Sequence, residues 1–260
     1  MYLSEFFDDA DDEILGCIHC KGAKPLGMKL KMAFQPIVDV DAREVFAYEA
    51  LVRGANGESA GAVIASVAPD DMYTFDQTCR VLAIETAQRL GIKSYLSINF
   101  LPNAVYEPAT CIRLTLAAAR KVGFPPDRLI FEMTESEKIS DPEHALRIIK
   151  DYQRRGFLTA IDDFGAGHSG LNLLAEFQPH IVKLDMALTR DIDSDKVRRA
   201  IVSGVIGTCK ALGCKIVAEG VETPGELAAL RSMGINLIQG YLLARPAVEA
   251  LPEPDYTHCT

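Results

Sequence analysis

Long apolar runs are absent from this sequence of 260 residues. No segment approaches the roughly 18 to 20 consecutive apolar residues that a membrane-spanning helix needs. The first residues, MYLSEFFDDADDEI, also lack the basic and apolar segments of a signal peptide. We therefore expect no membrane insertion and a cytoplasmic location.

An excess of basic residues is missing as well. The chain has 27 Lys and Arg against 36 Asp and Glu, which gives a formal net charge of −9. Proteins that hold the backbone of DNA or RNA carry a basic footprint, so we expect no nucleic-acid partner. If the substrate is an anion, metal ions must supply much of the positive charge.

The cysteines show no disulfide framework, because there are seven and their spacing matches no small secreted domain. We interpret them as free thiols in a reducing compartment. Cys17 and Cys20 have the spacing of half a zinc site, without an obvious second half. They fall within residues 1–30, which show little periodicity and which we expect to form an acidic, flexible N-terminal arm.

From about residue 31 onward, short apolar runs alternate with helical patterns. Each run is rich in β-branched and aromatic residues and indicates a buried strand. The predicted strands cover 32–38, 45–51, 95–100, 128–134, 157–162, 180–185, 214–219 and 235–240. The predicted helices cover 74–90, 108–122, 142–155, 195–212 and 224–233. This alternation is typical of a mainly parallel sheet covered by helices.

The predicted strands end in functional groups, which favours a closed barrel over an open sheet. The strand-end residues are Glu49, Asn99, Glu132, Asp162 with Asp163, Lys183, Glu219 and Gln239. In a barrel the carboxyl ends of the strands converge on one mouth, where active sites of that fold lie. An open sheet would spread several of them along an edge. We predict an α/β, TIM-like (β/α)8 barrel over residues 31–250 as a single domain, followed by a tail over 251–260.

The acids of this set predict a metal centre. Carboxylates at the ends of apolar strands are costly to bury unless they are paired or bind metal. The candidate ligands are Glu49, Glu132, Asp162, Asp163 and Glu219, with Asn99 as a neutral donor. Hard oxygen donors favour Mg²⁺ or Mn²⁺ over zinc. Because Asp162 and Asp163 are adjacent, they could contact two ions, as in two-metal phosphoester hydrolysis.

Lys183 is the cationic residue of the strand-end set. Beside metals and carboxylates, it could orient or help deprotonate an attacking water, or neutralise charge that develops on the phosphorane. Glu219 is then a candidate ligand of the second metal or a contact of that water.

The segment GAGHSG at 165–170 matches the dinucleotide-binding pattern G-x-G-x-x-G, and Asp185 ends the next predicted strand. However, Asp162 and Asp163 lie close before the glycines and would repel a pyrophosphate unless metals intervene. The preceding strand also lies halfway along the chain rather than opening a βαβ unit. We therefore favour a mobile glycine-rich lid at the barrel mouth over a nicotinamide or flavin site.

The motifs of the chain resemble, in order, those of the EAL-domain family. The signature E-A-L-x-R occurs at residues 49–53. The other motifs are FQP at 34–36, SINF at 97–100, FEMTE at 131–135, IDDFG at 161–165, VKLD at 182–185, AEGVE at 218–222 and QGY at 239–241 with Pro246. The strings FAYEALVRGANGE, SINFLPNAVY and GLNLLAEFQP also resemble the subgroup attached to blue-light-sensing modules. Neither such a sensor nor a GGDEF-type cyclase half fits in this chain.

The resemblance implies a metal-dependent phosphodiesterase of bacterial second-messenger signalling, which hydrolyses cyclic di-GMP to linear pGpG, often as a homodimer. It implies that two ions, Mg²⁺ or Mn²⁺, are held by Glu49, Asn99, Glu132 and Asp162 and by Asp162 with Asp163. Lys183, Glu219 and Glu49 match catalytic positions, of which Lys183 and Glu219 hold or activate the water. Gln35, Leu51, Arg53 and Gln239 match substrate-binding positions. Glu135 matches the anchor of the glycine-rich loop, and Glu222 matches a supporting acid.

Departures from the family pattern lie in the predicted lid, where His168 and Gly170 stand in place of the Tyr and Ser of many members. The alternative function is a non-hydrolysing cyclic di-GMP receptor, or an EAL module that docks on a regulatory protein. Such a module typically has lost one or more of the polar positions, whereas this chain retains them.

Overall fold

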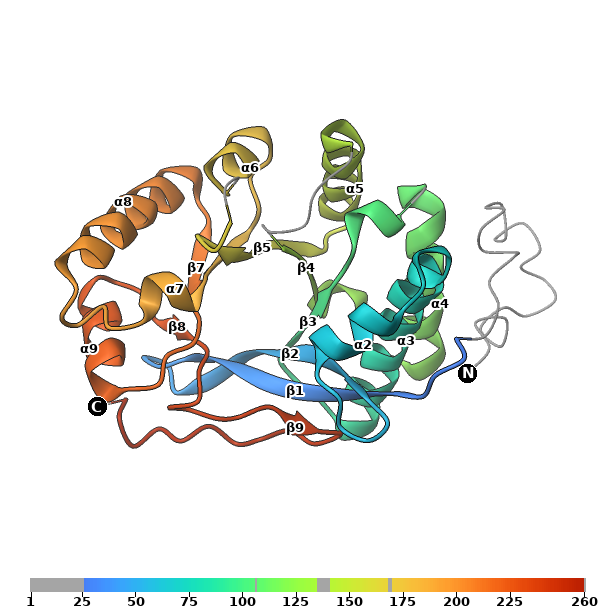
Figure 1. The fold of residues 1–260 in the computed structure, drawn as a ribbon, viewed down its shortest axis with the longest axis horizontal. Coiled ribbons are helices and arrows are strands. Elements are labelled where there is room, and N and C mark those ends of the chain that lie inside the picture. Colours follow the sequence, from blue (N-terminus) through green and yellow to red (C-terminus); the bar gives the residue numbers. More distant parts are fainter. Residues whose placement is uncertain (1–25, 106, 135–140, 168–169, 260) are drawn as a thin grey trace.

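The barrel lies at the centre of the computed structural model, which describes residues 26–105, 107–134, 141–167 and 170–259. Strands β2 to β8 follow one another in sequence order, and β1 lies between β8 and β2 and closes the ring (Figure 1). The strands are β1 (Leu30–Asp39), β2 (Glu44–Gly54), β3 (Tyr95–Asn99), β4 (Leu129–Thr134), β5 (Leu158–Phe164), β6 (Ile181–Leu184), β7 (Lys215–Ala218) and β8 (Leu237–Ile238). The predicted TIM-like barrel is confirmed. Most of the predicted arm, including Cys17 and Cys20, lies outside the described residues.

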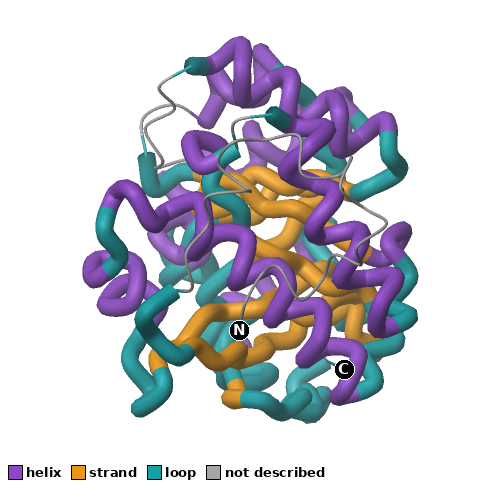
Figure 2. The backbone as a smooth tube through the Cα atoms, turned by 90° about the vertical axis from the view of Figure 1, so that its right-hand side faces the viewer, coloured by secondary structure: helices purple, strands orange, loops and turns teal. Residues whose placement is uncertain are grey.

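Helices surround the strands, as Figure 2 shows. The predicted helices are α3 (Met72–Leu90), α4 (Pro108–Val122), α5 (Pro142–Arg154), α8 (Lys196–Leu212) and α9 (Pro224–Ser232). The sequence did not indicate the short helices α2 (Ala60–Ser66), α6 (Gly170–Glu176) and α7 (Met186–Thr189), the 3-10 turns η3 (Pro69–Asp71), η4 (Pro102–Ala104) and η5 (Pro126–Arg128), or the strand β9 (Ala247–Val248). These elements are too short to show a clear hydrophobic period.

Helix boundaries follow local chemistry. Pro108 occupies the first turn of α4, where its missing N–H is not needed. The same helix stops at Gly123, whose φ of 73° is left-handed. Helix α9 begins with a capping box, in which the Thr223 side chain accepts from the Glu226 N–H and the Glu226 carboxylate accepts from the Thr223 N–H.

Strand β1 departs from the simple barrel repeat. It forms an antiparallel hairpin with β2, in which Leu30 pairs with Gly54 and Asp39 pairs with Glu44, and the described residues 40–43 form the turn. It is also antiparallel to β8, whereas successive pairs from β2–β3 to β7–β8 are parallel. Only parallel neighbours need a long crossover connection. A short turn therefore suffices between β1 and β2.

Two layers of side chains fill the barrel. Side chains two residues apart share one face of a strand. The lower layer is apolar and consists of Ile37, Ala47, Ile130, Ala160, Ile181, Val217 and Leu237. Two residues further along each of the parallel strands β2 and β4–β8 comes a polar residue: Glu49, Glu132, Asp162, Lys183, Glu219 and Gln239. In the reversed strand β1 the order is inverted, so Gln35 precedes Ile37.

The residues after β9 return along the barrel. Tyr48 Oη donates to the Pro252 carbonyl at 3.1 Å, and the Asp255 N–H donates to the Leu243 carbonyl at 2.8 Å. Cys259 is buried. The cysteines that the structure describes are free thiols, as predicted: Cys79, Cys111, Cys209, Cys214 and Cys259. Within the described part of the chain, the helices are too short or too polar to cross a membrane.

Gly240 provides a test of the packing at the barrel mouth. A Cβ atom at this position would lie 2.0 Å from the Val221 carbonyl oxygen and 2.5 Å from the Val221 nitrogen, both in the backbone. Because backbone cannot yield as a side chain can, Gly240→Ala should lower the free energy of unfolding by about 3 kcal/mol or more, measured by urea denaturation.

The matched control is Gly204→Ala in α8, where a Cβ atom meets nothing within 4 Å. Alanine is the better helix former, so this variant should gain up to about 1 kcal/mol. Equal stability of the two variants would contradict the packing described here.

Candidate functional site

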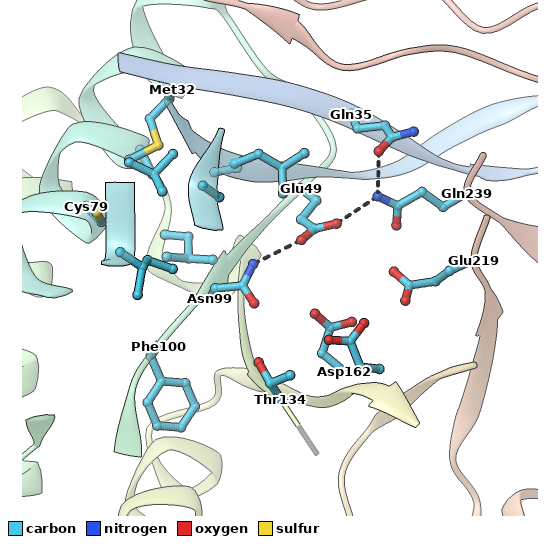
Figure 3. A pocket seen from close by; sticks show the side chains of 18 of the residues that line it. Met32, Gln35, Glu49, Cys79, Asn99, Phe100, Thr134, Asp162, Glu219 and Gln239 are labelled. Carbon is cyan, nitrogen blue, oxygen red and sulfur yellow. Dashed lines mark hydrogen bonds between the residues drawn. The ribbon is translucent and has the colours of Figure 1, made fainter. Parts of the chain in front are cut away.

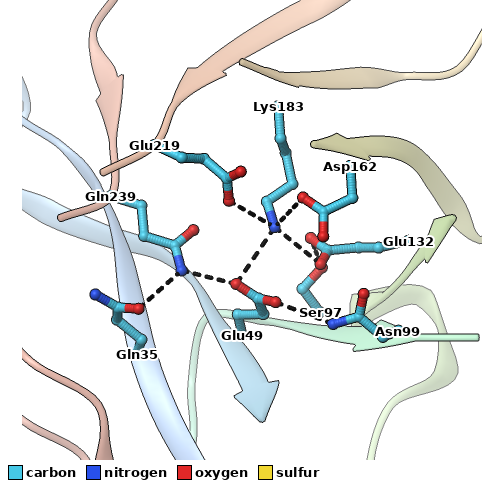
Figure 4. A network of polar contacts seen from close by, with 9 residues as sticks. All are labelled: Gln35, Glu49, Ser97, Asn99, Glu132, Asp162, Lys183, Glu219 and Gln239. Carbon is cyan, nitrogen blue, oxygen red and sulfur yellow. Dashed lines mark hydrogen bonds and ion pairs between the residues drawn. The ribbon is translucent and has the colours of Figure 1, made fainter. Parts of the chain in front are cut away.

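The ammonium group of Lys183 lies at the centre of the polar layer (Figure 4). Its side chain is 1% exposed, and Nζ lies 2.8 Å from Asp162 Oδ1, 2.9 Å from Glu219 Oε1, 3.0 Å from Glu132 Oε2 and 3.3 Å from Glu49 Oε2. Burial disfavours a charged lysine, but the surrounding carboxylates outweigh it and raise the pKa of Lys183 well above its usual value. One cation therefore faces several acids, and the cluster carries surplus negative charge.

Side-chain amides connect Glu49 to neighbouring strands. Asn99 Nδ2 donates to Glu49 Oε1 at 3.0 Å, and Gln239 Nε2 donates to Glu49 Oε2 at 2.7 Å. Gln239 Nε2 also lies 3.3 Å from Gln35 Oε1, and Gln35 Nε2 donates to the Ala244 carbonyl at 3.1 Å. These contacts fix the orientation of Glu49 from both sides of β2.

Ser97 belongs to the same network, although the sequence analysis, which noted it in the SINF motif, gave it no role. Its hydroxyl donates to Glu132 Oε1 at 2.5 Å. Ser97 lies two residues before Asn99 in β3, so both side chains face the barrel interior. This two-residue spacing from Asn99 was the feature of the sequence that could have identified Ser97.

The acids of the cluster have pKa values shifted in different directions. Burial alone would raise the pKa of Glu49, but Lys183 and the two amide donors hold it below its usual value. Burial, followed by repulsion from Glu49 and Asp162, raises the pKa of Glu132 to about 8 despite Lys183. Burial likewise raises the pKa of Glu219 well above its usual value. Burial and repulsion from neighbouring acids therefore favour the protonated forms of Glu132 and Glu219.

A bulge in β5 brings two successive acids to the mouth. Ile161 pairs with Val182 and Phe164 with Leu184, so β5 has one residue more than β6 in this interval. Asp163 adopts a φ of 53°, in the left-handed region that aspartate tolerates better than most residues. In a regular strand these neighbours would point to opposite faces. The bulge is therefore what lets both carboxylates face one site.

Two groups of acids have the spacing of a metal site. Oxygens of Glu49, Glu132 and Asp162 lie within 4.8 Å of one another, and so do oxygens of Asp162, Asp163 and Glu219. The groups share Asp162, as a bridging ligand requires. The donors are hard oxygens, and the surplus negative charge around Lys183 calls for further cations. These residues therefore fit divalent ions such as Mg²⁺ or Mn²⁺.

A cavity of about 490 Å³ opens above the cluster (Figure 3). Its polar side includes Gln35, Glu49, Asn99, Asp162, Asp163, Glu219 and Gln239, and its apolar side includes Met32, Val52, Ile64, Phe75, Cys79 and Phe100. Lys183 and Glu132, each 1% exposed, are absent from this lining. The acids at the surface of the cavity are thus held from beneath by a buried cation.

The remaining predicted site residues differ in their positions. Leu51 lines the cavity, and so does Glu222, which also pairs with Arg190 at 2.9 Å. Arg53 is not among the described residues of the lining, and its Nη1 donates to the Val52 carbonyl at 2.8 Å. Glu135 and His168 lie outside the described residues, whereas Gly170 begins α6.

Further lining residues had no role in the sequence analysis, among them Asp76, Thr134, Met186 and Tyr241. Tyr241 occurs in a recognised motif. Asp76 lies within a predicted helix, and no local pattern indicates that this helix contacts the cavity.

Comparison with known proteins identifies the family. The chain matches the family model of the EAL domain over residues 26–246. The protein belongs to the EAL-domain family. A standalone versatile EAL protein of Vibrio cholerae O395, solved in its c-di-GMP bound form, is 50% identical with a TM-score of 0.87, covering 90% of this chain and 99% of its own.

The blue-light-associated subgroup is confirmed by two other similar proteins. Klebsiella pneumoniae BlrP1, solved as a manganese/cy-diGMP complex, is 37% identical with a TM-score of 0.82, covering 89% of this chain and 59% of its own. The blue light- and temperature-regulated antirepressor BluF of Escherichia coli strain K12 is 35% identical over 222 residues, which is 85% of this chain and 55% of BluF. The EAL protein thus spans little more than half of these two relatives.

Replacing Lys183 by methionine tests the charge balance of the cluster. The variant leaves the buried carboxylates without their cation, so we expect a loss of about 3 to 5 kcal/mol in the free energy of unfolding, measured in EDTA at neutral pH. The acids with raised pKa values bind protons more tightly in the folded state, so the loss should shrink as the pH falls toward 5.

Lys215→Met is the control, because this exposed lysine lies at the opposite end of the barrel, 5.9 Å from the centroid of the Phe46 ring. We expect it to cost less than about 1 kcal/mol. A Lys183 variant as stable as this control would refute the assigned charge balance.

Proposed function

We propose that this EAL protein is a metal-dependent phosphodiesterase, which hydrolyses one phosphodiester bond of cyclic di-GMP to give linear pGpG. The observation that carries the proposal is that two clusters of three acids share Asp162 beneath a cavity of about 490 Å³. Two divalent ions at such spacing suit in-line phosphoester hydrolysis. The resulting charge also suits a phosphate substrate, which the bare acids would repel.

The relatives support this substrate. Several curated relatives are named cyclic di-GMP phosphodiesterases. The Vibrio cholerae protein was solved with c-di-GMP, and BlrP1 with manganese and cy-diGMP.

Two ions, Mg²⁺ or Mn²⁺, would share the acids of the mouth. Glu49, Glu132 and Asp162 would hold one ion, with Asn99, whose Nδ2 donates to Glu49, offering its Oδ1. Asp162 and Asp163 would hold the second ion, and Glu219 is close enough to contribute. When bound, such ions polarise a phosphoryl oxygen and lower the pKa of a water molecule.

The side chains around the ions have separate tasks. The resemblance implies that Lys183 holds or activates the water, but because Lys183 is buried below the cavity, we assign it the task of holding the acids in place and balancing their charge. Glu219 faces the cavity and is the group that would orient the attacking water and take its proton. The reaction consumes one water, forms one P–O bond to the water oxygen and breaks the P–O bond to a sugar oxygen, which takes a proton and leaves as a hydroxyl, so that the product carries a terminal phosphate. Gln35, Leu51 and Gln239 line the cavity and would contact the substrate.

Further predictions for this protein concern its assembly, its location and one substrate contact. A homodimer and a substrate contact by Arg53 remain predictions from the family resemblance. A cytoplasmic location remains a prediction from the N-terminal sequence and the cysteines, and a regulatory protein partner remains a prediction tied to the alternative function.

The direct test is a chromatographic assay of cyclic di-GMP with Mg²⁺, with Mn²⁺ and with EDTA. Conversion to pGpG should require a divalent ion. Asp162→Asn should lower the rate by about 1,000-fold or more, because each metal supplies several kcal/mol of transition-state stabilisation. Asp70→Asn, an exposed change on η3, is the control and should keep the wild-type rate.

The same assay distinguishes the hydrolase from the alternative function of a receptor. Because BluF is named an antirepressor, binding of cyclic di-GMP should be measured together with turnover. Calorimetric binding of cyclic di-GMP without any pGpG over hours, in the presence of either metal, would replace the hydrolase by a receptor.

A further inference from the structure

Arg80 is the largest residue among those whose side chains are fully buried in the described structure, and it lies outside the acid cluster. On α3, its Nη2 lies 2.6 Å from Asp76 Oδ2, and its Nη1 donates to the Tyr152 hydroxyl of α5 at 2.8 Å. The two partners of the ion pair are 0% and 1% exposed. Removing such charges from water costs about as much as their attraction returns. Stability alone therefore gives a weak reason for this pair.

Asp76 connects the pair to the barrel mouth. Its Oδ1 accepts the backbone N–H of Leu101 at 3.0 Å. Leu101 lies two residues after Asn99, the last residue of β3 and a proposed metal ligand. Between them, the Phe100 N–H donates to the Glu132 carbonyl at 3.0 Å and joins this segment to β4. Asp76 thus holds the backbone just beyond Asn99.

Arg80 contacts the reverse side of the same two strands. The carbon at the centre of its guanidinium lies 5.5 Å from the centroid of the Phe100 ring and 5.7 Å from that of Phe131. Phe131 directly precedes Glu132, and Asn99 pairs with Glu132 across β3 and β4. Because successive side chains point to opposite faces, the two rings face α3 while Asn99 and Glu132 face the metal site.

Tyr152 completes this arrangement. Its ring centroid lies 4.7 Å from that of Phe131 and 5.5 Å from that of Phe100, while its hydroxyl accepts from Arg80. Nε of Arg80 has no hydrogen-bond partner among the described residues. The aromatic rings are therefore a major part of the environment of the guanidinium.

We propose that Asp76 and Arg80 are positioning residues of the metal site, which set the placement of Asn99 and Glu132 from outside the barrel. The proposal rests on the proposed function of the acid cluster. Asp76 acts through the Leu101 N–H, and Arg80 acts through the Phe100 and Phe131 rings. Groups behind metal ligands commonly change metal affinity by about 10-fold to 100-fold when they are removed.

The experiment compares two double variants that both remove the pair of charges, so that neither leaves a lone buried charge. Asp76→Leu combined with Arg80→Met lacks an acceptor for the Leu101 N–H. Asp76→Asn combined with Arg80→Met keeps a side-chain oxygen at that place. Mn²⁺ affinity is measured by calorimetry, the folded state by thermal unfolding, and kcat and KM by hydrolysis of cyclic di-GMP.

We expect the leucine variant to bind Mn²⁺ about 10-fold more weakly than wild type, with kcat reduced more than KM is raised. The Mn²⁺ affinity and kcat of the asparagine variant should lie between those of the leucine variant and wild type. A folded leucine variant with wild-type Mn²⁺ affinity and kcat overturns the proposal.

If the leucine variant does not fold, Arg80→Lys decides the question. Lysine keeps a positive charge beside Asp76 but lacks the planar guanidinium that contacts both rings. Mn²⁺ binding weakened several-fold supports the proposal, and unchanged binding overturns it.

The two readouts keep this proposal separate from the proposed function. A wild-type protein that binds Mn²⁺ without hydrolysing cyclic di-GMP refutes the hydrolase, while the affinities of the variants still decide the positioning. Wild-type hydrolysis with unaltered variants refutes the positioning alone. Failure of the wild type to bind Mn²⁺ refutes both.

Discussion

Repulsion among carboxylates that converge on the buried Lys183 ammonium is the constraint on which the rest of the structure depends. Glu49, Glu132, Asp162 and Glu219 all lie within 3.3 Å of that nitrogen. Burial, together with repulsion from Glu49 and Asp162, raises the pKa of Glu132 to about 8 despite Lys183. An apolar layer lies directly beneath, which limits how water can relieve this repulsion. Divalent cations at the mouth would satisfy the same constraint and would provide the charge that the proposed phosphate substrate requires.

Two irregularities of the barrel bring additional polar groups to its mouth. The antiparallel β1 brings Gln35 beside Glu49 with only a turn as connection. The bulge in β5 turns Asp163 to the same side as Asp162, which converts one acid into a pair. Each departure from regular geometry thus places a polar group where a regular strand would place none. The helices behind β3 and β4 have a related role, since Asp76 and Arg80 contact the strand ends that carry Asn99 and Glu132.

Membership of the EAL family establishes the fold, whereas function depends on the site. A related protein of similar sequence is named an antirepressor, and others are named phosphodiesterases. A barrel with the same strands serves either purpose. The proposed hydrolase function rests on the set of oxygen ligands together with Glu219, a carboxylate that lines the cavity.

The sequence by itself determined the strands, the longer helices and the acids of the site. Apolar runs and helical periodicity are local patterns, and the polar residue that ends each run identifies the mouth of a parallel barrel. Only the tertiary structure decided the direction of β1 and the orientation of Asp163. It also decided that Ser97 bonds to Glu132 and that Arg53 bonds to the Val52 carbonyl. It further decided that Asp76, Arg80 and Tyr152 meet behind the strands that carry Asn99 and Glu132. The pairing of β1, the bulge in β5 and the contact of Arg80 with Tyr152 join residues far apart in the chain or depend on a local irregularity, which short-range patterns do not encode.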